Sequence, residues 1–220
     1  MEENNVVIDT EEEKPLEVDG GKKRFGVAGI VKKLFSPEKR IWTIAILGVF
    51  VLLVIGIIFV STYFSPQNVA LRFVKAMQYD DVVTMHSVMA YDNYQYLLKD
   101  KAEAEYFEER SDYYEEDIDN WKTYSKLLKE RTEDYLFEEY GEYKITFEAT
   151  REKDISKRKL ESEVDLEYLE NKTDFNIDQV SKVKTVTVKM KIEGEEKVKR
   201  YTYTVYMVKV GLFWKALDAE

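Results

Sequence analysis

The longest apolar stretch of the chain covers residues 41–60 and reads IWTIAILGVFVLLVIGIIFV. It contains no charged residue, and the next charge after it is Arg72. An α-helix rises 1.5 Å per residue, so about 20 residues of this kind cross a hydrocarbon core of roughly 30 Å. The pattern therefore predicts a transmembrane helix over residues 41–64, between a tail of residues 1–40 and a domain of residues 65–220.

Basic residues on either side of the span indicate its orientation, because lysine and arginine near a span are retained on the cytoplasmic side. The residues that precede the span are rich in them: Lys22, Lys23, Arg24, Lys32, Lys33, Lys39 and Arg40. The first charges after the span are Arg72 and Lys75, soon followed by Asp80 and Asp81. We therefore expect a single-pass protein of a cell membrane, with its N-terminus in the cytoplasm and its C-terminal domain extracytoplasmic.

A cleaved signal peptide is the competing interpretation of the apolar stretch. Such a peptide has an apolar core of roughly 7–15 residues, followed by small residues at a cleavage site. The core here is longer, and residues 60–64 read VSTYF, without an Ala-x-Ala pattern. The chain also lacks cysteine, which excludes lipid attachment through an N-terminal cysteine. An uncleaved signal-anchor fits these observations better.

The tail has two segments of different composition. Residues 1–21 are acidic and too poor in apolar residues to fold alone. Residues 22–40 alternate basic and apolar positions, and Ile30 and Leu34 are spaced as on one face of a helix. This segment suits a short helix that lies on the inner leaflet and attracts anionic lipid. The alternative is that its basic residues only set the topology.

The C-terminal domain begins with helical patterns. Ser65 and Pro66 suit the N-cap and the first position of a helix that runs to about Tyr79. Asp80-Asp81 ends this helix and caps a second, short one that contains His86. We interpret His86 as structural, because the chain has no second histidine to share a metal ion.

A long helix is predicted over residues 121–140. Asp119 or Asn120 provides its N-cap, and Gly141 suits the position that follows its last turn. The preceding residues 91–120 are rich in tyrosine and acidic residues, and their apolar positions follow the helical period only loosely.

The remainder of the domain has strand patterns, with one more helix between the first two strands. Residues 143–148 and 183–192 alternate apolar and polar positions, and residues 193–196, EGEE, form a hairpin turn. The predicted order is strand, helix and then three strands, at residues 143–148, 156–171, 183–192, 197–210 and 212–217. In the helix we expect Leu160, Val164 and Tyr168 on one face. Helices followed by an antiparallel meander make the fold class α+β.

Three short motifs carry a resemblance to a known family. Residues 65–69 read SPQNV, residues 76–81 read AMQYDD and residues 208–215 read VKVGLFWK. In these motifs and their order the chain resembles the nuclear-transport-factor-two-like superfamily, and more closely the bacterial envelope domains described as lumazine-binding-like. Those domains often show Gly-Asp where this chain has Tyr79-Asp80, and Asp-Gly where it has Val210-Gly211. The resemblance implies a cone-like domain of helices packed on a curved antiparallel sheet, with a cavity at the wide end.

Composition excludes several classes of protein. The chain has 220 residues, no cysteine and one histidine, so disulfide scaffolds and structural zinc sites are excluded. The formal net charge is −10, and residues 92–120 alone hold 11 acidic and 3 basic side chains. Such an acidic segment argues against nucleic-acid binding, which depends on lysine and arginine to neutralise phosphates.

No catalytic, cofactor-binding or metal-ligating residue can be assigned from the sequence. Glycine-rich phosphate loops are missing, and a catalytic triad would have to use His86. An enzyme of the superfamily could use one aspartate and one tyrosine, but no particular pair is singled out. The carboxylates Glu115, Glu116, Asp117 and Asp119 suggest calcium, yet Lys122 occupies the position where the loop of an EF-hand requires glycine.

The sequence therefore favours a non-enzymatic membrane protein of the cell envelope that presents an extracytoplasmic binding or assembly domain. We expect its partners to be the lipid bilayer and either envelope proteins or a second copy of the chain, with no cofactor and no nucleic acid. A narrower alternative is a component of an envelope secretion or conjugation machine. An alternative from another class is a small-molecule-binding protein or an enzyme that uses the cavity of the cone.

Overall fold

The computed structural model describes residues 40–220, with side chains described from residue 45 onward. The acidic segment and most of the basic segment of the predicted tail lie outside the described residues. The chain divides into two units between Val54 and Ile55. Helix α2 (Arg40–Tyr63) is 24 residues long, which confirms the helix predicted at residues 41–64. The segment Ala45–Tyr63 has 19 residues and a mean hydropathy of 2.8, so it is long and apolar enough to cross a membrane. None of this segment is buried against the rest of the chain.

The first helices of the domain begin where their caps predict. Helix α3 (Pro66–Gln78) has Ser65 as its N-cap, and the Ser65 hydroxyl accepts a hydrogen bond from the Asn68 amide at 3.3 Å. Asp81 caps helix α4 (Val82–Val88) in the same way. The apolar face of α3 is buried against all four strands of the sheet.

The acidic segment that follows is helical, although its ends carry no glycine or proline. It forms helices α5 (Asn93–Leu98) and α6 (Glu103–Tyr114). Lys99 and Glu115 end these helices with φ angles of 51° and 55°, in the left-handed region that usually favours glycine. Helix α7 (Trp121–Tyr140) then starts after its predicted cap, Asn120, and ends at Gly141.

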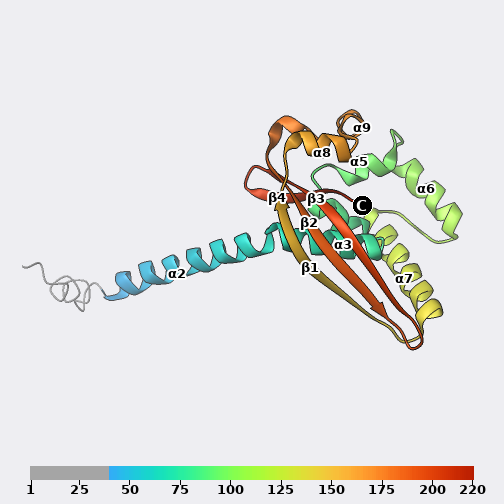
Figure 1. Ribbon diagram of the computed structural model, residues 1–220, viewed down its shortest axis with the longest axis horizontal. Coiled ribbons are helices and arrows are strands. Elements are labelled where there is room, and N and C mark those ends of the chain that lie inside the picture. Colours follow the sequence, from blue (N-terminus) through green and yellow to red (C-terminus); the bar gives the residue numbers. More distant parts are fainter. Residues whose placement is uncertain (1–39) are drawn as a thin grey trace, which may run out of the picture. The chain divides into compact units, whose positions relative to one another are not determined.

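Four antiparallel strands form one sheet in the order β1-β2-β3-β4 (Figure 1). The strands are β1 (Lys144–Asp154), β2 (Val180–Glu193), β3 (Val198–Val210) and β4 (Phe213–Ala219). On β2 the alternate residues Val186, Val188, Met190 and Ile192 are buried, as the alternation predicts. The fold class α+β and the antiparallel meander are therefore confirmed.

The single helix predicted at residues 156–171 is wrong. The segment forms two short helices, α8 (Lys157–Glu163) and α9 (Leu166–Lys172), before a turn of 3₁₀ helix, η1 (Ile177–Gln179). Val164 between them is extended, with φ −122° and ψ 134°, and the Asp165 carboxylate accepts a hydrogen bond from the Tyr168 amide to start α9. The break rotates the second helix, so Leu169 is buried and Tyr168 is 43% exposed.

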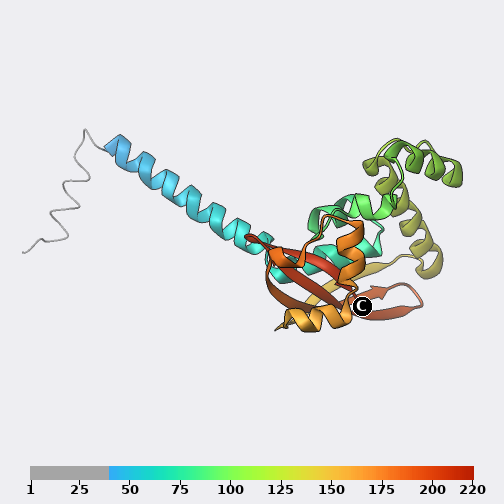
Figure 2. The same cartoon turned by 90° about the horizontal axis from the view of Figure 1, so that it is seen from above.

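The side chains of the domain form three apolar clusters. The largest lies between the sheet and helices α3, α8 and α9, and it includes Phe73, Leu160 and Val208. A second, aromatic cluster is formed by residues of α5, α6 and the start of α7, and α6 stands away from the sheet in both views (Figures 1 and 2). A third joins the end of α7 to the β2–β3 hairpin through Tyr140 and Met190.

Candidate functional site

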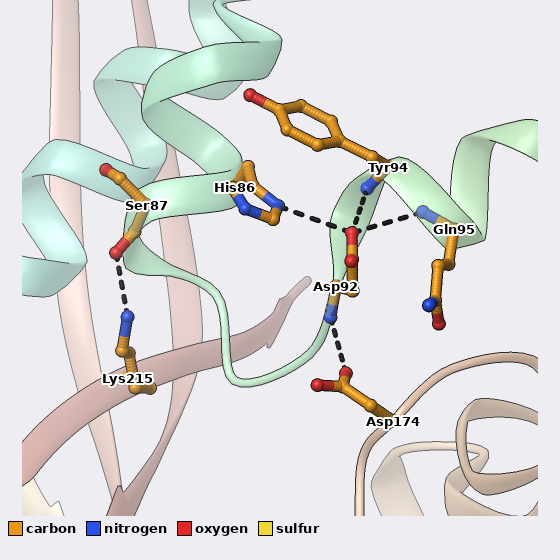
Figure 3. Close-up of polar contacts among 7 residues, drawn as sticks. All are labelled: His86, Ser87, Asp92, Tyr94, Gln95, Asp174 and Lys215. Atoms are coloured by element: carbon orange, nitrogen blue, oxygen red, sulfur yellow. Dashed lines mark hydrogen bonds and ion pairs between the residues drawn. The ribbon is translucent and has the colours of Figure 1, made fainter. Parts of the chain in front are cut away.

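The only histidine of the chain lies in a polar junction between α4 and α5 (Figure 3). His86 Nδ1 lies 3.4 Å from Oδ1 of Asp92, the residue that caps α5. The same oxygen accepts hydrogen bonds from the amides of Tyr94 at 2.9 Å and Gln95 at 3.2 Å. The Asp92 amide donates to Oδ1 of Asp174 at 2.7 Å, which ties the junction to the loop before η1.

Aromatic stacking holds the His86 ring in place. The ring lies 3.9 Å from the Tyr94 ring at an angle of 6°, and Tyr94 stacks on Trp121 at 4.4 Å and 8°. The stack extends the aromatic cluster of α5, α6 and α7 as far as α4. These contacts support a structural role for His86, because its ring packs against the stack and its Nδ1 faces a capping carboxylate.

An imidazole beside a carboxylate can also serve as a general base, provided that a nucleophile lies within reach of the ring. The neighbouring hydroxyl, that of Ser87, is engaged elsewhere: it donates to the Thr84 carbonyl at 2.7 Å and accepts from Arg72 at 3.2 Å. The Ser87 carbonyl accepts a hydrogen bond from Lys215 Nζ at 2.8 Å (Figure 3). The junction therefore joins α3, α4, α5, β4 and the loop before η1, and its polar atoms position those elements.

A cleft of about 480 Å³ opens between α3, α4 and α7. It is lined by Arg72, Lys75, Ala76, Tyr79, Asp81, Thr84, Lys129 and Glu133. Asp81 and Tyr79 both line this cleft. An aspartate and a tyrosine are the pair of residue types that an enzyme of the resembled superfamily could use.

The surroundings of Tyr79 and Asp81 determine the protonation state of each side chain. Burial raises the pKa of Tyr79, and the nearby Tyr143 and Glu133 raise it further, so the phenol stays neutral. Burial also acts to raise the pKa of Asp81, but hydrogen bonds from Thr84 and Ser125 outweigh it, and the pKa is lowered. Asp81 is thus an ionised carboxylate whose oxygens are occupied by the cap of α4, which suits a structural anion better than a proton acceptor.

The acidic residues that suggested a calcium site have separate structural roles. Glu115 ends α6, and Asp119 accepts a hydrogen bond from the Thr123 hydroxyl at 2.9 Å at the start of α7. Within residues 40–220, no three side chains of histidine, aspartate or glutamate come together as a metal site. The carboxylates of α6 and of the loop after it point instead to solvent, since Glu105, Glu108, Asp112, Glu115, Glu116 and Asp117 are all exposed.

The tyrosines divide between the interior and the surface. Tyr206 on β3 is buried, and its hydroxyl donates to Glu220 at 2.8 Å. Tyr201 and Tyr203 are half-buried and their ring centres lie 6.3 Å apart in a stack, so sheet packing explains them. Tyr113 on α6 differs, because 72% of it is exposed among the carboxylates of that helix.

Compared with protein-family models, curated proteins and solved structures, the chain matches none of them.

Several residues of the polar junction do not stand out in the sequence. Asp92 carries a recognisable signal, because an aspartate before a helical segment is a common N-cap. Asp174 and Lys215 carry none, since they are separated from their partners by 82 and 128 positions.

Proposed function

We propose that the protein is a single-pass membrane protein that presents its C-terminal domain, outside the cytoplasm, as a non-catalytic binding or assembly module. The observation that carries this proposal is the apolar surface of α2. Leu52, Ile57 and Phe59 are each more than 60% exposed, and the whole segment Ala45–Tyr63 is unburied. A helix of this composition would not stay exposed to water, so a bilayer is its natural surrounding.

The polar groups of the domain support a non-catalytic role. Asp81 and Asp92 cap helices, and the hydroxyl of Ser87 is bound to Thr84 and Arg72. In the part of the chain that the structure describes, these side chains hold elements together. The two hydroxyls bonded to the Asp81 carboxylate, those of Thr84 and Ser125, likewise serve the cap of α4 and the contact with α7.

The domain's topology supports the resemblance to the nuclear-transport-factor-two-like superfamily. Helices come first, the sheet order is β1-β2-β3-β4, and a helical segment follows β1. In the cone of that superfamily, α3 would line the inner face of the sheet. Here that space is occupied by large apolar side chains, including Phe73 and Met207, which favours a module that binds through its surface.

The surface best suited to a partner is the acidic face of α6 and the loop after it. It combines exposed carboxylates with the exposed ring of Tyr113, and tyrosine is enriched in protein interfaces. Residues 92–120 carry a net charge of −8, so the partner that fits is a basic surface of another envelope protein.

Membrane topology can be tested directly because the chain has no cysteine of its own. Single variants Ser36→Cys and Glu196→Cys would be treated in intact bacterial cells with a maleimide that does not cross membranes. We expect Glu196→Cys to be labelled in intact cells and Ser36→Cys only after lysis. The opposite pattern, or recovery of the chain in the soluble fraction, contradicts the proposal.

The assembly role is tested by crosslinking the full chain in its native membrane and identifying its neighbours. One variant carries Glu105→Gln, Glu108→Gln, Asp112→Asn and Glu116→Gln on the acidic face. A matched variant removes the same charge from other exposed positions: Glu138→Gln, Glu142→Gln, Glu148→Gln and Glu161→Gln. We expect a defined set of neighbours that only the first variant loses. Recovery of the wild-type protein alone contradicts the assembly role.

A second candidate function is supported by the cleft between α3, α4 and α7. Arg72, Lys75 and Lys129 line it together with two carboxylates, Asp81 and Glu133, so a small anionic molecule is the ligand class that it fits. Thermal unfolding of the full chain in detergent, with and without inorganic phosphate, separates the two candidates. A rise in melting temperature that Lys75→Ala abolishes would favour a small-molecule-binding protein.

A further inference from the structure

The turn between β3 and β4 exposes an apolar tip. Gly211 adopts φ 58° and so provides the left-handed position of the turn. Leu212 is 83% exposed and Phe213 is 39% exposed. Turn positions favour glycine, asparagine, aspartate and serine, which solvate well and adopt turn conformations easily. A leucine contributes nothing to the geometry of this turn, so the domain by itself does not explain it.

Aromatic rings connect this tip to the end of the apolar helix. The Phe213 ring lies 4.6 Å from the Phe64 ring, and Phe64 lies 4.9 Å from Tyr63. Tyr63 is the last residue of α2, and its ring stacks on Phe59 one turn earlier at 5.7 Å. The exposed turn is therefore continuous with the apolar surface at the end of the candidate span.

One cation contacts these rings, and a second shares a binding partner with it. The guanidinium of Arg72 lies 4.3 Å from the centre of the Tyr63 ring. Arg72 and Lys215 both bind Ser87, at its hydroxyl and its carbonyl. Aromatic rings beside arginine and lysine are the composition that proteins place at the boundary between lipid tails and headgroups. Basic side chains at that depth attract anionic headgroups.

We propose that the β3–β4 turn inserts Leu212 and Phe213 into the outer leaflet, with Arg72 and Lys215 at headgroup level, so that the domain rests on the membrane surface. The inference rests on the proposed membrane anchor and deepens it, because it adds a second membrane contact to the span. Lipid is the occupant that the geometry indicates, since Phe213 contacts the residue that follows α2, and the end of α2 lies at the membrane surface.

The depth of the turn can be measured by fluorescence quenching. The cysteine-free full chain would carry Leu212→Cys labelled with bimane, in vesicles of phosphatidylcholine and phosphatidylglycerol that contain a spin-labelled lipid. The matched control is Val198→Cys, another exposed apolar residue, at the start of β3, the strand whose end leads into the turn. Leu52→Cys in α2 serves as the reference for a probe inside the bilayer. Circular dichroism confirms that each variant is folded.

We expect strong quenching at Leu52→Cys and about threefold more quenching at Leu212→Cys than at Val198→Cys. If Leu52→Cys is quenched while Leu212→Cys behaves like Val198→Cys, the inserted turn is refuted and the membrane anchor stands. If neither Leu52→Cys nor Leu212→Cys is quenched, both proposals fail. Protection of Leu212→Cys from aqueous iodide without quenching by lipid would show that protein covers the turn, which also refutes the inference.

Discussion

At the scale of single residues, Asp81 connects three helices. Its carboxylate accepts hydrogen bonds from the Thr84 amide at 2.9 Å, the Thr84 hydroxyl at 2.7 Å and the Ser125 hydroxyl at 2.9 Å. Ser125 belongs to α7 and is buried, so this bond fixes α7 against the α3–α4 corner. The same residue therefore caps a helix and determines one wall of the cleft.

We predict that Asp81→Ala lowers the free energy of unfolding by about 1–2 kcal/mol, because α4 loses its N-cap and Ser125 loses its partner. Asp81→Asn retains one acceptor oxygen for the Thr84 amide and the Ser125 hydroxyl, but loses the charge and the oxygen that accepts from the Thr84 hydroxyl, so it should destabilise less than Asp81→Ala. Urea unfolding of the full chain in detergent measures both. A variant Asp81→Ala as stable as the wild type would contradict the assignment.

The same carboxylate makes stability depend on pH. Its pKa in the folded protein is lowered from the ordinary value of 3.8. Its charged form therefore contributes stability that is complete above that ordinary value and is lost as the pH falls through the folded pKa. We expect the difference in stability between wild type and Asp81→Asn to be constant near neutral pH and to shrink in acid. A difference that grows in acid would contradict this sign.

The residues that could be predicted from the sequence are those whose partners are close along the chain. Ser65 and Asn120 act within three residues of their own position, so local pattern identifies them. The contact of Asp92 with Asp174 spans 82 positions and depends on the fold. For the same reason the sequence indicates that a helix contains His86, but not which residues contact it.

At the scale of elements, the β2–β3 hairpin is joined to α7 at one close contact. A Cβ on Gly194 would lie 2.3 Å from the Tyr140 carbonyl oxygen, and the Glu195 amide donates to that oxygen at 3.0 Å. The sequence explains Gly194 as a turn residue. The structure adds a second reason, because only glycine allows the last turn of α7 to approach the hairpin so closely.

We predict that Gly194→Ala destabilises the protein by about 1–3 kcal/mol, since a backbone carbonyl has little room to move away from the added methyl group. Glu196→Ala, at an exposed position two residues on, is the control and should change little. Hydrogen exchange should show lost protection at the hairpin tip and the end of α7. Unchanged exchange there would mean that the two elements are not in contact.

The acidic segment shows why some elements are harder to predict. Left-handed positions at Lys99, Asp100 and Glu115 end its helices, and none of them is glycine. The local signals for a helix end are therefore missing, and the segment folds because its rings pack on Trp121. At Val164 the local signals mislead in the other direction. The apolar spacing predicts one continuous helix, but Asp165 caps a new helix and the first helix ends before it.

The aromatic cluster should consequently unfold separately from the sheet. Trp121→Ala removes the ring that contacts Tyr94, Tyr106 and Phe107, a loss of about 3–5 kcal/mol for a buried tryptophan. We expect amide protection to fall across α5 and α6 while β2 and β3 keep theirs. The control is Tyr113→Ala on α6, whose ring is 72% exposed. Equal loss of protection in the sheet would show a single cooperative unit.

At the scale of the whole molecule, charge is distributed unequally before and after helix α2. Basic residues are concentrated before it, whereas the segment 92–120 after it has a net charge of −8. In the proposed topology the basic residues set the orientation, because they resist transfer across the membrane during insertion. The acidic residues would attract a basic partner outside the cytoplasm. The two functions of charge can therefore be tested separately.

Orientation should respond to the basic residues and not to the acidic ones. We predict that a variant with glutamine at four positions, Lys32, Lys33, Lys39 and Arg40, together with Ser61→Lys and Thr62→Lys, inserts partly in the reverse orientation. Labelling of Glu196→Cys in intact cells should then fall, and labelling of Ser36→Cys should rise. The matched control replaces Glu11, Glu12 and Glu13 with glutamine, which should leave both signals unchanged because acidic residues contribute little to topology. If the basic variant also keeps the wild-type pattern, the folded domain and not the flanking charge determines the orientation.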